Sequence, residues 1–449
     1  MTGPAELQRL RVRQDRLVAR LEELGQVGAI AGGGCARLAL SDADRAGRDL
    51  VVSWMRDLGL VVTVDAIGNV FGTRAGREDR PPVLCGSHID TVATGGIYDG
   101  NLGVLAGLEV MEVLAEAGVV TRRPLTVAFF TDEEGARFAP DMLGSSVFVG
   151  GMALETAHDI VGIDGARLGT ELERIGYLGS VPCPGLVPYA YVELHIEQGP
   201  VLEAHGDDIG AVTGVQGISW QEITVLGQSN HAGTTPIAYR HDAGYVAAAT
   251  SVFLRGLARE LGGDQVATVG RATLHPDLVN VIPGRAVFTV DLRNTDEAVL
   301  VEAEARLTEE LTRLAAEEDV SIERRVLARF TPVEFDQKVV EMVEATATLL
   351  GHRVRRLPSG AGHDAQMLAR VCPAGMIFVP SAGGISHNPA EYTSPEALLA
   401  GADVLLHVLV GLAEEPDGAR QGRRRHGTDE GAGGVGASDA PDETTGHPR

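Results

Sequence analysis

The sequence predicts an α/β protein whose sheet contains parallel strands and whose chain is interrupted by a smaller, inserted α+β domain. Short apolar strands alternate with helices in the first half of the chain, and this pattern changes between about residues 214 and 328 before it resumes. The chain has 449 residues, which is more than one compact core usually holds, so two or more domains are expected.

The first 213 residues are expected to form the first part of the larger, catalytic domain. Leucines at helical spacing predict a helix over residues 5–25, and a second helix is expected from the capping residue Ser41 to Gly59. The later elements are expected as a hairpin at 61–74, a strand and loop at 81–90, a helix at 104–118 and a buried strand at 124–130.

Residues 214–328 form the predicted inserted domain. Three segments have the pattern of strands: WQEITVLGQ, VATVGRATL and AVFTVDLRN. Helices are expected over 242–262 and 295–318. A helix at 335–350 and the strand MIFVP then resume the first pattern, so residues 329–415 form the second part of the catalytic domain. Residues 416–449 have few large apolar side chains to offset their ordering entropy, which predicts a disordered tail.

The composition narrows the classes of partner. Asp and Glu outnumber Lys and Arg by 62 to 38, which argues against nucleic acid or an anionic membrane as partner. The four cysteines are scattered without a C-x-x-C pair, which is typical of a reducing compartment. Neither a signal peptide nor a bilayer-spanning stretch is recognisable, so a cytoplasmic protein is expected.

Polar residues follow several of the predicted strands. His88 lies in GSHID, just past an apolar strand, where α/β sheets bind ligands, and Asp90 is placed to hold the far nitrogen of a ligating imidazole. A loop histidine beside an Asx turn would give the same pattern. Asp99, in DGN before a helix, fits either a turn with an N-cap or a carboxylate shared by two cations.

Three successive acids at 132–134 follow the strand LTVAFF. Such acids repel one another unless cations neutralise them, although a solvated turn is an alternative. Adjacent glutamates, here Glu133 and Glu134, can divide the work of binding a metal and activating water.

Two further motifs carry histidines. In YVELHIEQG the alternation of apolar and polar residues puts Glu193, His195 and Glu197 on one strand face, as an edge strand facing water would also do. His387 lies in a glycine-rich loop after MIFVP.

The joint pattern favours a metal site over five unrelated polar residues. All five candidates fall at strand ends or in the loops after them, and they offer nitrogen and oxygen but no thiolate. This set suits two borderline cations, such as zinc or manganese, that share one carboxylate. The candidate ligands are His88, Asp99, Glu134, His195 and His387.

The inserted domain adds residues suited to a small anionic substrate. His231 lies in the loop NHAGTTP, Asn280 in VNVIP, and Arg293 near the end of the strand AVFTVDLRN. A histidine can donate to an oxyanion, an asparagine can hold a polar edge of a substrate and an arginine can bind a carboxylate. An exposed polar side chain that binds nothing would explain each of them equally well. The stretch 358–364, which holds Gly360 and Gly362, precedes a helix start that favours anions.

These motifs together resemble the M20-type zinc amidase family, which contains N-carbamoyl-L-amino-acid hydrolases and allantoate amidohydrolases. The resemblance extends from about residue 5 to about residue 415. His195 is informative, because related peptidase branches usually carry an acid there. The resemblance rests on seven segments in the same order: GSHIDTV, YDGNLGV, TDEEGARF, ELHIEQGPVLE, SNHAGTTP, SGAGHDAQ and GISHNPAE.

The resemblance implies a metallopeptidase-like catalytic domain and an inserted lid domain that also forms a homodimer interface. It implies two divalent ions per subunit, zinc or else manganese, cobalt or nickel. His88 and His195 would hold one, Glu134 and His387 the other, and Asp99 would bridge them. Glu133 would be the general base, and His231 would reach into the partner subunit's site. The implied substrate contacts are Gln198, His231, Asn280, Arg293, Gly360 and Gly362.

The resemblance also implies the reaction, which is cleavage of a C–N bond in a small anionic ureido substrate. N-carbamoyl-L-amino acids are the first expectation, because TDEEGARF, GVQGISW and VDLRN are more similar to the carbamoylases. Allantoate is the alternative that SGAGHDAQ favours. An inactive binding protein on the same fold would lack a ligand or Glu133, and every such position is filled. The remaining class of function is a scaffold protein that acts through its C-terminal tail.

Overall fold

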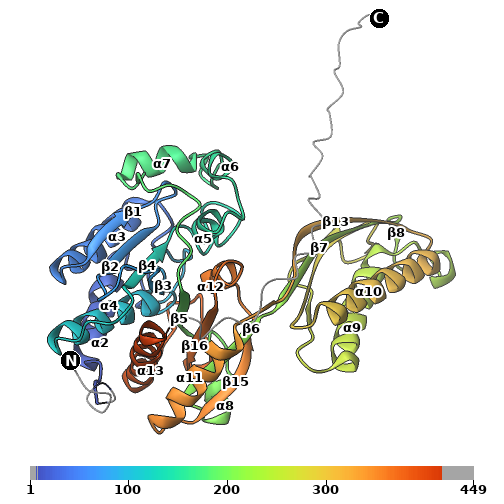
Figure 1. The fold of residues 1–449 in the computed structure, drawn as a ribbon. Coiled ribbons are helices and arrows are strands. Elements are labelled where there is room, and N and C mark those ends of the chain that lie inside the picture. The colour runs from blue at the N-terminus through green and yellow to red at the C-terminus, as the bar shows by residue number, and fades with distance from the viewer. Residues whose placement is uncertain (1–6, 8, 417–449) are drawn as a thin grey trace, which may run out of the picture. The chain divides into compact units, whose positions relative to one another are not determined.

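The computed structural model describes residue 7 and residues 9–416 of the chain (Figure 1). The predicted disordered tail lies, except for its first residue, outside the described residues, so that expectation stays a prediction. The described residues form two large sheets, each with its own hydrophobic core.

The larger sheet has nine strands in the order β1-β2-β4-β3-β5-β16-β6-β14, with β15 beside β6. Its centre, from β4 to β16, is parallel. This confirms the α/β class, but β2 and β6 run antiparallel to the centre, so parallel pairing dominates only in the middle. The strands are β1 (Val61–Val64), β2 (Val70–Arg74), β3 (Val83–His88), β4 (Leu125–Phe130), β5 (Ala190–Ile196), β6 (Ile209–Val215), β14 (Val333–Glu334), β15 (Val354–Ser359) and β16 (Ala374–Val379).

Two apolar helices, α4 (Asn101–Glu116) and α13 (Pro395–Glu414), pack against this sheet and against each other. In the described part of the chain, α13 is the one helix long and apolar enough to cross a membrane, but 72% of its apolar window is buried inside the protein. Its composition is therefore explained by its place in the core. The other helices of this part are α2 (Gln14–Gln26), α3 (Asp42–Asp57), α5 (Leu143–Phe148), α6 (Leu154–His158), α7 (Leu168–Ile175), α8 (Val201–His205), α11 (Gln337–Leu349) and α12 (Asp364–Leu368).

The first long helix begins later than the sequence predicts. The expected helix covers residues 5–25, whereas α2 begins at Gln14. The reason is that two backbone N–H groups before it donate to distant side chains: Val12 to Asp403 and Arg13 to Glu109, each at 2.8 Å. These bonds hold the segment in a non-helical path, which leucine spacing alone cannot reveal.

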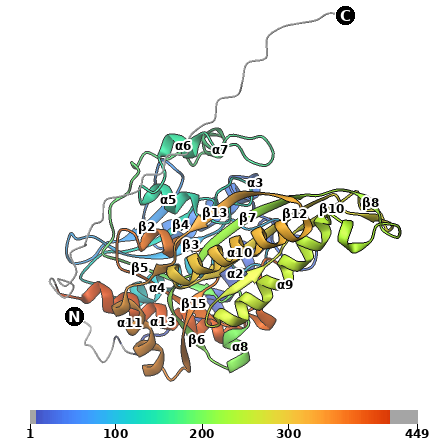
Figure 2. The same ribbon diagram turned by 90° about the vertical axis from the view of Figure 1, so that its right-hand side faces the viewer.

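The smaller sheet is antiparallel, in the order β10-β12-β7-β13 with β9 beside β12. The helices α9 (Ala243–Leu261) and α10 (Glu297–Glu318) lie together against it (Figure 2). Asp242 and Asp296 each cap one of these helices by accepting two backbone N–H groups. The strands are β7 (Gly217–Leu226), β9 (Val266–Thr268), β10 (Ala272–His275), β12 (Arg285–Asn294) and β13 (Ser321–Phe330), with β8 (Asn230–His231) and β11 (Val281–Ile282) as a separate pair.

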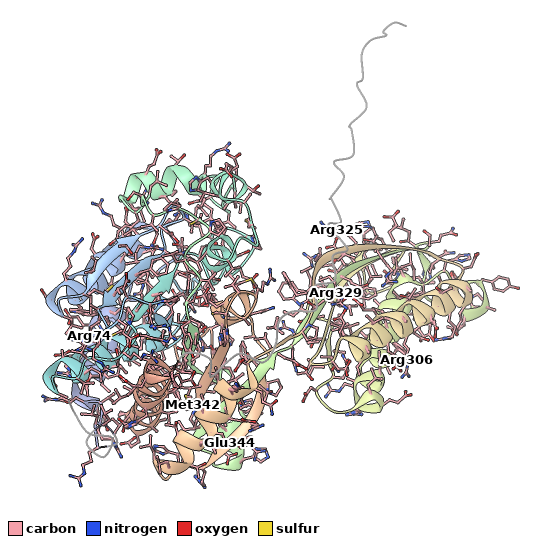
Figure 3. The ribbon with its side chains drawn as sticks, in the orientation of Figure 1. Arg74, Arg306, Arg325, Arg329, Met342 and Glu344 are labelled. Atoms are coloured by element: carbon pink, nitrogen blue, oxygen red, sulfur yellow. The ribbon has the colours of Figure 1, made fainter. Side chains whose placement is uncertain are left out.

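Ion pairs join the smaller sheet to its helices and the two helices to each other. Arg329 on β13 binds Glu297 and Glu304 of α10, and Arg306 of α10 binds Glu260 of α9 (Figure 3). Such part-exposed pairs contribute little energy, so the helices are held on the sheet mainly by the buried core between them.

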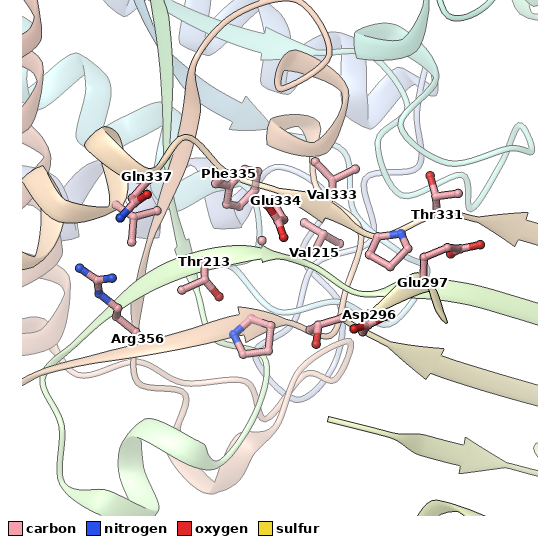
Figure 4. A pocket seen from close by; sticks show the side chains of 15 residues that line it. Thr213, Val215, Asp296, Glu297, Thr331, Val333, Glu334, Phe335, Gln337 and Arg356 are labelled. Atoms are coloured by element: carbon pink, nitrogen blue, oxygen red, sulfur yellow. The ribbon is translucent and has the colours of Figure 1, made fainter. Parts of the chain in front are cut away.

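Two short connections join the sheets. The chain leaves the larger sheet between Val215 and Gly217, and it returns between Phe330 and Val333. The expected domain boundaries are at 214 and 328, but both sheets belong to one compact unit, so the division into domains stays a prediction. A pocket of about 720 Å³ lies along the two connections (Figure 4). Its lining includes Thr213, Asp296, Phe335 and Arg356.

Candidate metal centre

The candidate ligands gather at the carboxyl ends of the parallel strands. His88 is the last residue of β3, Glu134 follows β4, and His195 is the second-last residue of β5. His387 follows β16, and Asp99 precedes α4. Strand β5 is central and buried along its whole length, so the edge-strand interpretation is wrong. The separate strand-end motifs therefore converge on one place.

His88, Asp99 and His195 form the first donor group, whose ligand atoms all lie within 4.8 Å of one another. Oδ1 of Asp99 lies 3.4 Å from Nε2 of His88 and 3.1 Å from Nε2 of His195. All three side chains are buried. Gly100 has φ +65°, and a Cβ there would lie 2.5 Å from the His88 ring, so this close approach requires glycine.

The ring nitrogens of this group are oriented for ligation. Nδ1 of His88 lies 2.9 Å from the carbonyl oxygen of Asp90, and Nδ1 of His195 lies 2.8 Å from that of Ile196. Each Nδ1–H can donate to a carbonyl, which leaves the Nε2 lone pair directed toward Asp99. That tautomer is the one that binds a cation through Nε2.

Asp90 is placed differently from the expectation. Its backbone carbonyl, rather than its carboxylate, is the close partner of His88, since Oδ1 lies 3.9 Å from Nδ1. The carboxylate accepts the backbone N–H groups of Glu133 and Glu134, both at 3.3 Å. Asp90 therefore connects the loop after β3 to the loop that carries the two glutamates.

Asp99, Glu134 and His387 form the second donor group. Nε2 of His387 lies 3.3 Å from Oε2 of Glu134 and 3.5 Å from Oδ2 of Asp99. The two oxygens of Asp99 thus face different groups, as a shared carboxylate requires. His387 is half-exposed and has φ +54°, an unusual conformation outside glycine that often occurs at functional sites.

Glu133 is buried beside the first group, with Oε2 3.5 Å from Nε2 of His88. Burial and the neighbouring charges of Asp364 and Glu134 raise its pKa well above the usual range, although His88 opposes this shift. A carboxyl group with a raised pKa is suited to hold a proton during a reaction near neutral pH.

The electrostatics of the cluster favour added positive charge. Burial lowers the pKa of His88, but the charges of Glu133 and Asp99 raise it well above its ordinary value. Hydrogen bonds to Asp99 and Glu134 raise the pKa of His387 to about 10. Carboxylates that bind protons this strongly onto imidazoles also attract cations, and the N and O donors suit zinc or manganese. The residues therefore fit divalent metal ions.

Gln198 joins the cluster next to its shared carboxylate. It has φ +57°, and its Nε2 donates to Oδ2 of Asp99 at 2.8 Å and to Ser386 at 3.3 Å. Glu197, which the alternation grouped with the candidates, instead accepts the backbone N–H groups of Val201 and Leu202 at the start of α8.

His231 lies on β8, Asn280 directly before β11, and Arg293 on β12. Nδ1 of His231 accepts the backbone N–H groups of Gly233 and Thr234, so Nε2 carries the proton when the ring is neutral. The carbonyl of Asn280 accepts the N–H of Ala232 in the same loop. In the described part of the chain, no hydrogen bond or ion pair joins His231 to the ligand cluster.

Arg293 and the glycine-rich loop meet directly. Nη1 of Arg293 donates to the carbonyl of Gly360 at 2.6 Å, and its guanidinium lies 5.6 Å from the Trp220 ring. Gly362 lies beside Met142, whose Cε would be 3.0 Å from an added Cβ. Residues 360–362 thus lie between Arg293 and Met142.

Sequence reasoning did not single out Glu391, although GISHNPAE contains it. It is buried, and it accepts hydrogen bonds from the loop of Asp99 and from Ser386. Its position four residues after His387 was the available signal.

Known proteins are similar to this chain over nearly its whole length. The family described as Peptidase family M20/M25/M40 matches residues 84–410. An N-carbamoyl-L-amino-acid amidohydrolase of Rhizobium meliloti is 43% identical over 415 residues, 92% of this chain and 99% of that protein. An allantoate amidohydrolase of Bacillus subtilis (strain 168) is 35% identical over 413 residues, 91% of this chain and 100% of that protein. The crystal structure of an amidase of the hydantoinase/carbamoylase family from Burkholderia multivorans has a TM-score of 0.89 and 46% identity, covering 91% of this chain and 99% of the other.

Proposed function

The chain belongs to peptidase family M20/M25/M40, and from this premise we propose that it is a binuclear metal amidohydrolase of N-carbamoyl-L-amino acids. The products would be the L-amino acid, ammonia and carbon dioxide. One observation carries the catalytic part of the proposal: Asp99 turns one carboxylate oxygen toward each donor group. The substrate part rests on the relative at 43% identity, which carries this activity in its name.

The proposed ligands are His88 and His195 for one ion, Glu134 and His387 for the other, and Asp99 for both. Bound divalent ions would polarise the ureido carbonyl and lower the pKa of the attacking water. The proposed ions are zinc, or else manganese, cobalt or nickel. The family is metal-dependent, and the oxygen and nitrogen donors accept each of these ions.

Glu133 is the proposed general base. It would take a proton from the attacking water and pass it to the leaving nitrogen, which must be protonated before the C–N bond can break. Its position supports this role, because its buried carboxyl has Oε2 3.5 Å from Nε2 of His88, one of the proposed ligands.

His231 is the proposed donor to the oxyanion that forms when water adds to the carbonyl. Gly233 and Thr234 fix Nδ1 as an acceptor, which leaves Nε2–H free to donate. Gln198, Asn280, Arg293, Gly360 and Gly362 would hold the remaining polar groups of the substrate, with Arg293 on its carboxylate.

We assign His231 to the site of a partner subunit in a homodimer and residues 214–328 to a lid domain that forms the interface. Exposed apolar side chains gather in the same loops and on α9. Val252 of α9 is 75% exposed, and Ile237 is 76% exposed. Large exposed apolar groups favour a covered surface in the assembled protein. The others are Tyr239, Tyr245, Leu278 and Val279.

Allantoate is the second candidate substrate, because a relative with 35% identity bears that activity. The test is an assay of metal-reconstituted protein with N-carbamoyl-L-amino acids beside allantoate, with the products identified by chromatography. Faster turnover of allantoate would replace the first proposal by the second. Hydrolysis of neither by protein with full metal content would favour an inactive binding protein. We also propose a cytoplasmic location, which fractionation of the native host would test.

A further inference from the structure

Glu391 connects the two loops that carry Asp99 and His387. Its Oε1 accepts the backbone N–H groups of Tyr98 and Asp99, both at 3.1 Å. Its Oε2 accepts the hydroxyl of Ser386 at 3.0 Å. The side chain is 5% exposed, so these bonds are shielded from water.

The hydroxyl of Ser386 also lies near the shared carboxylate. It is 3.2 Å from Oδ2 of Asp99, the oxygen that faces the second donor group, and 3.3 Å from Nε2 of Gln198. A hydroxyl carries one proton, so it can donate to Asp99 or to Glu391 but not fully to both. Glu391 is thus linked to Asp99 in two ways. It accepts the backbone N–H of Asp99, and it accepts the hydroxyl of Ser386, which contacts the side chain of Asp99.

The side chain of Glu391 fills the space next to Gly96. A Cβ on Gly96 would lie 2.2 Å from Oε1 of Glu391, so any larger residue at 96 would displace the carboxylate. The displaced group is the one that accepts from Tyr98 and Asp99. Gly96 therefore offers a way to disturb Glu391 without removing it.

We propose that Glu391 is a positioning residue that holds Asp99 between the two donor groups, so that one carboxylate can serve both ions. The inference rests on the proposed binuclear centre, and it does not depend on the identity of the substrate. Without Glu391, the loop at 96–99 loses the partner of two backbone N–H groups. Asp99 then moves relative to His387, and the shared site weakens.

The first test measures metal binding and needs no substrate. Full-length protein is stripped with a chelator, and zinc affinity and stoichiometry are measured by competition with a chromogenic chelator. Glu391→Ala should lower the affinity of at least one site by roughly tenfold or more, the usual effect of losing a group that orients a ligand. Glu391→Gln keeps an oxygen for Tyr98 and Asp99, so it should remain close to the parent protein.

The control is Asp403→Ala. Asp403 is also a buried carboxylate that accepts a backbone N–H, that of Val12 at 2.8 Å, but it lies on α13. Its loss should lower the melting temperature and leave zinc affinity unchanged. Equal loss of affinity in Asp403→Ala and Glu391→Ala would show a general effect of instability and would overturn the inference.

A second test reads the geometry of the site directly. The visible absorption of cobalt(II) depends on its ligand arrangement, so the cobalt-substituted parent protein, Glu391→Ala and Glu391→Gln are compared. The alanine variant should show a changed spectrum that the glutamine variant restores. Parent-like affinity and spectrum in folded Glu391→Ala would overturn the proposal.

Gly96→Ala keeps the carboxylate but displaces it, so it should change affinity and spectrum in the same direction. Its control is Gly256→Ala in α9, where an added Cβ meets nothing within 4 Å. If Glu391→Ala does not fold, Gly96→Ala decides, and if that variant also fails, Ser386→Ala decides. Parent-like behaviour of the deciding variant would reject the inference. If the proposed binuclear centre is absent, the parent protein itself binds no zinc. That result differs from failure of the Glu391 inference, in which the parent protein binds zinc and the deciding variant binds it equally well.

Discussion

The carboxylate of Asp291 accepts hydrogen bonds from both Nε and Nη2 of Arg293, its neighbour on the same face of β12. The shortest of these contacts is 2.9 Å. Because Nη1 donates to the carbonyl of Gly360, three of the five N–H donors are already used. One donor remains on each terminal nitrogen, and either of them can still serve a substrate carboxylate.

Arg293→Lys should raise KM for substrates with a free carboxylate by roughly tenfold or more, with a smaller effect on kcat. Lysine cannot reproduce the paired geometry of the guanidinium. Steady-state kinetics with the acid and with its amide analogue provide the check, because the amide should be poor for the parent and little worse for the variant. Equal losses on both substrates would make Arg293 a structural residue.

Removal of the metal ions should abolish activity and lower the melting temperature. The carboxylates of Asp99 and Glu134 repel that of Glu133, so bound cations stabilise the folded chain. An ion in hundredfold excess over its Kd should contribute about 2.7 kcal/mol to stability. Differential scanning calorimetry and activity after re-addition of zinc, manganese, cobalt or nickel test this. Full activity in protein shown by elemental analysis to be metal-free would refute the mechanism.

Glu133→Gln and Glu134→Gln should give different phenotypes. The first variant removes the proposed base, so turnover should fall by roughly a hundredfold or more while metal content stays near normal. The second removes a ligand from the group with His387, so it should bind less metal. Mass spectrometry of bound metal beside kcat separates the two. A reversed outcome would exchange the roles assigned to these glutamates.

His231→Ala and Glu133→Gln should complement each other if His231 serves the partner subunit. Each variant alone should be nearly inactive. When equal amounts are unfolded together and refolded, random pairing gives roughly half mixed dimers, each with one intact site, so roughly one quarter of the parent activity should return.

A mass tag on one variant verifies that subunits have exchanged. As the control, each variant is unfolded and refolded by itself, and neither should recover activity. Mixed dimers without activity would place His231 in its own subunit's site or outside catalysis.

The fold was largely predictable because its elements carry local patterns. Ser41 caps α3 as expected, accepting the N–H of Asp44, and the strand LTVAFF is buried throughout. The start of α2 was not predictable, because Asp403 and Glu109 decide it from far along the chain. Local pattern carries little information about such contacts.

The ligand motifs could be found because they follow recognisable strands, and the structure brings them together. The detail around them could not be found in the same way. The backbone carbonyl of Asp90 lies closer to His88 than the carboxylate of Asp90 does. This arrangement depends on the path of the loop. Glu391 was missed because a buried glutamate after a histidine motif has no pattern of its own, and its importance appears only when the loop of Asp99 lies against it.

The order of the ligands along the chain has a consequence for how the protein is made. Asp99 and Ser386, which touch in the folded state, are separated by 287 residues, and the histidine that completes the second group comes just after Ser386. A ribosome therefore exposes His88, Asp99 and His195 long before it adds His387. The nascent chain can assemble the first donor group, and the second donor group must wait until synthesis is nearly complete. An ion held at the second group then joins distant parts of the chain, so its binding offsets the entropy of closing a very long loop.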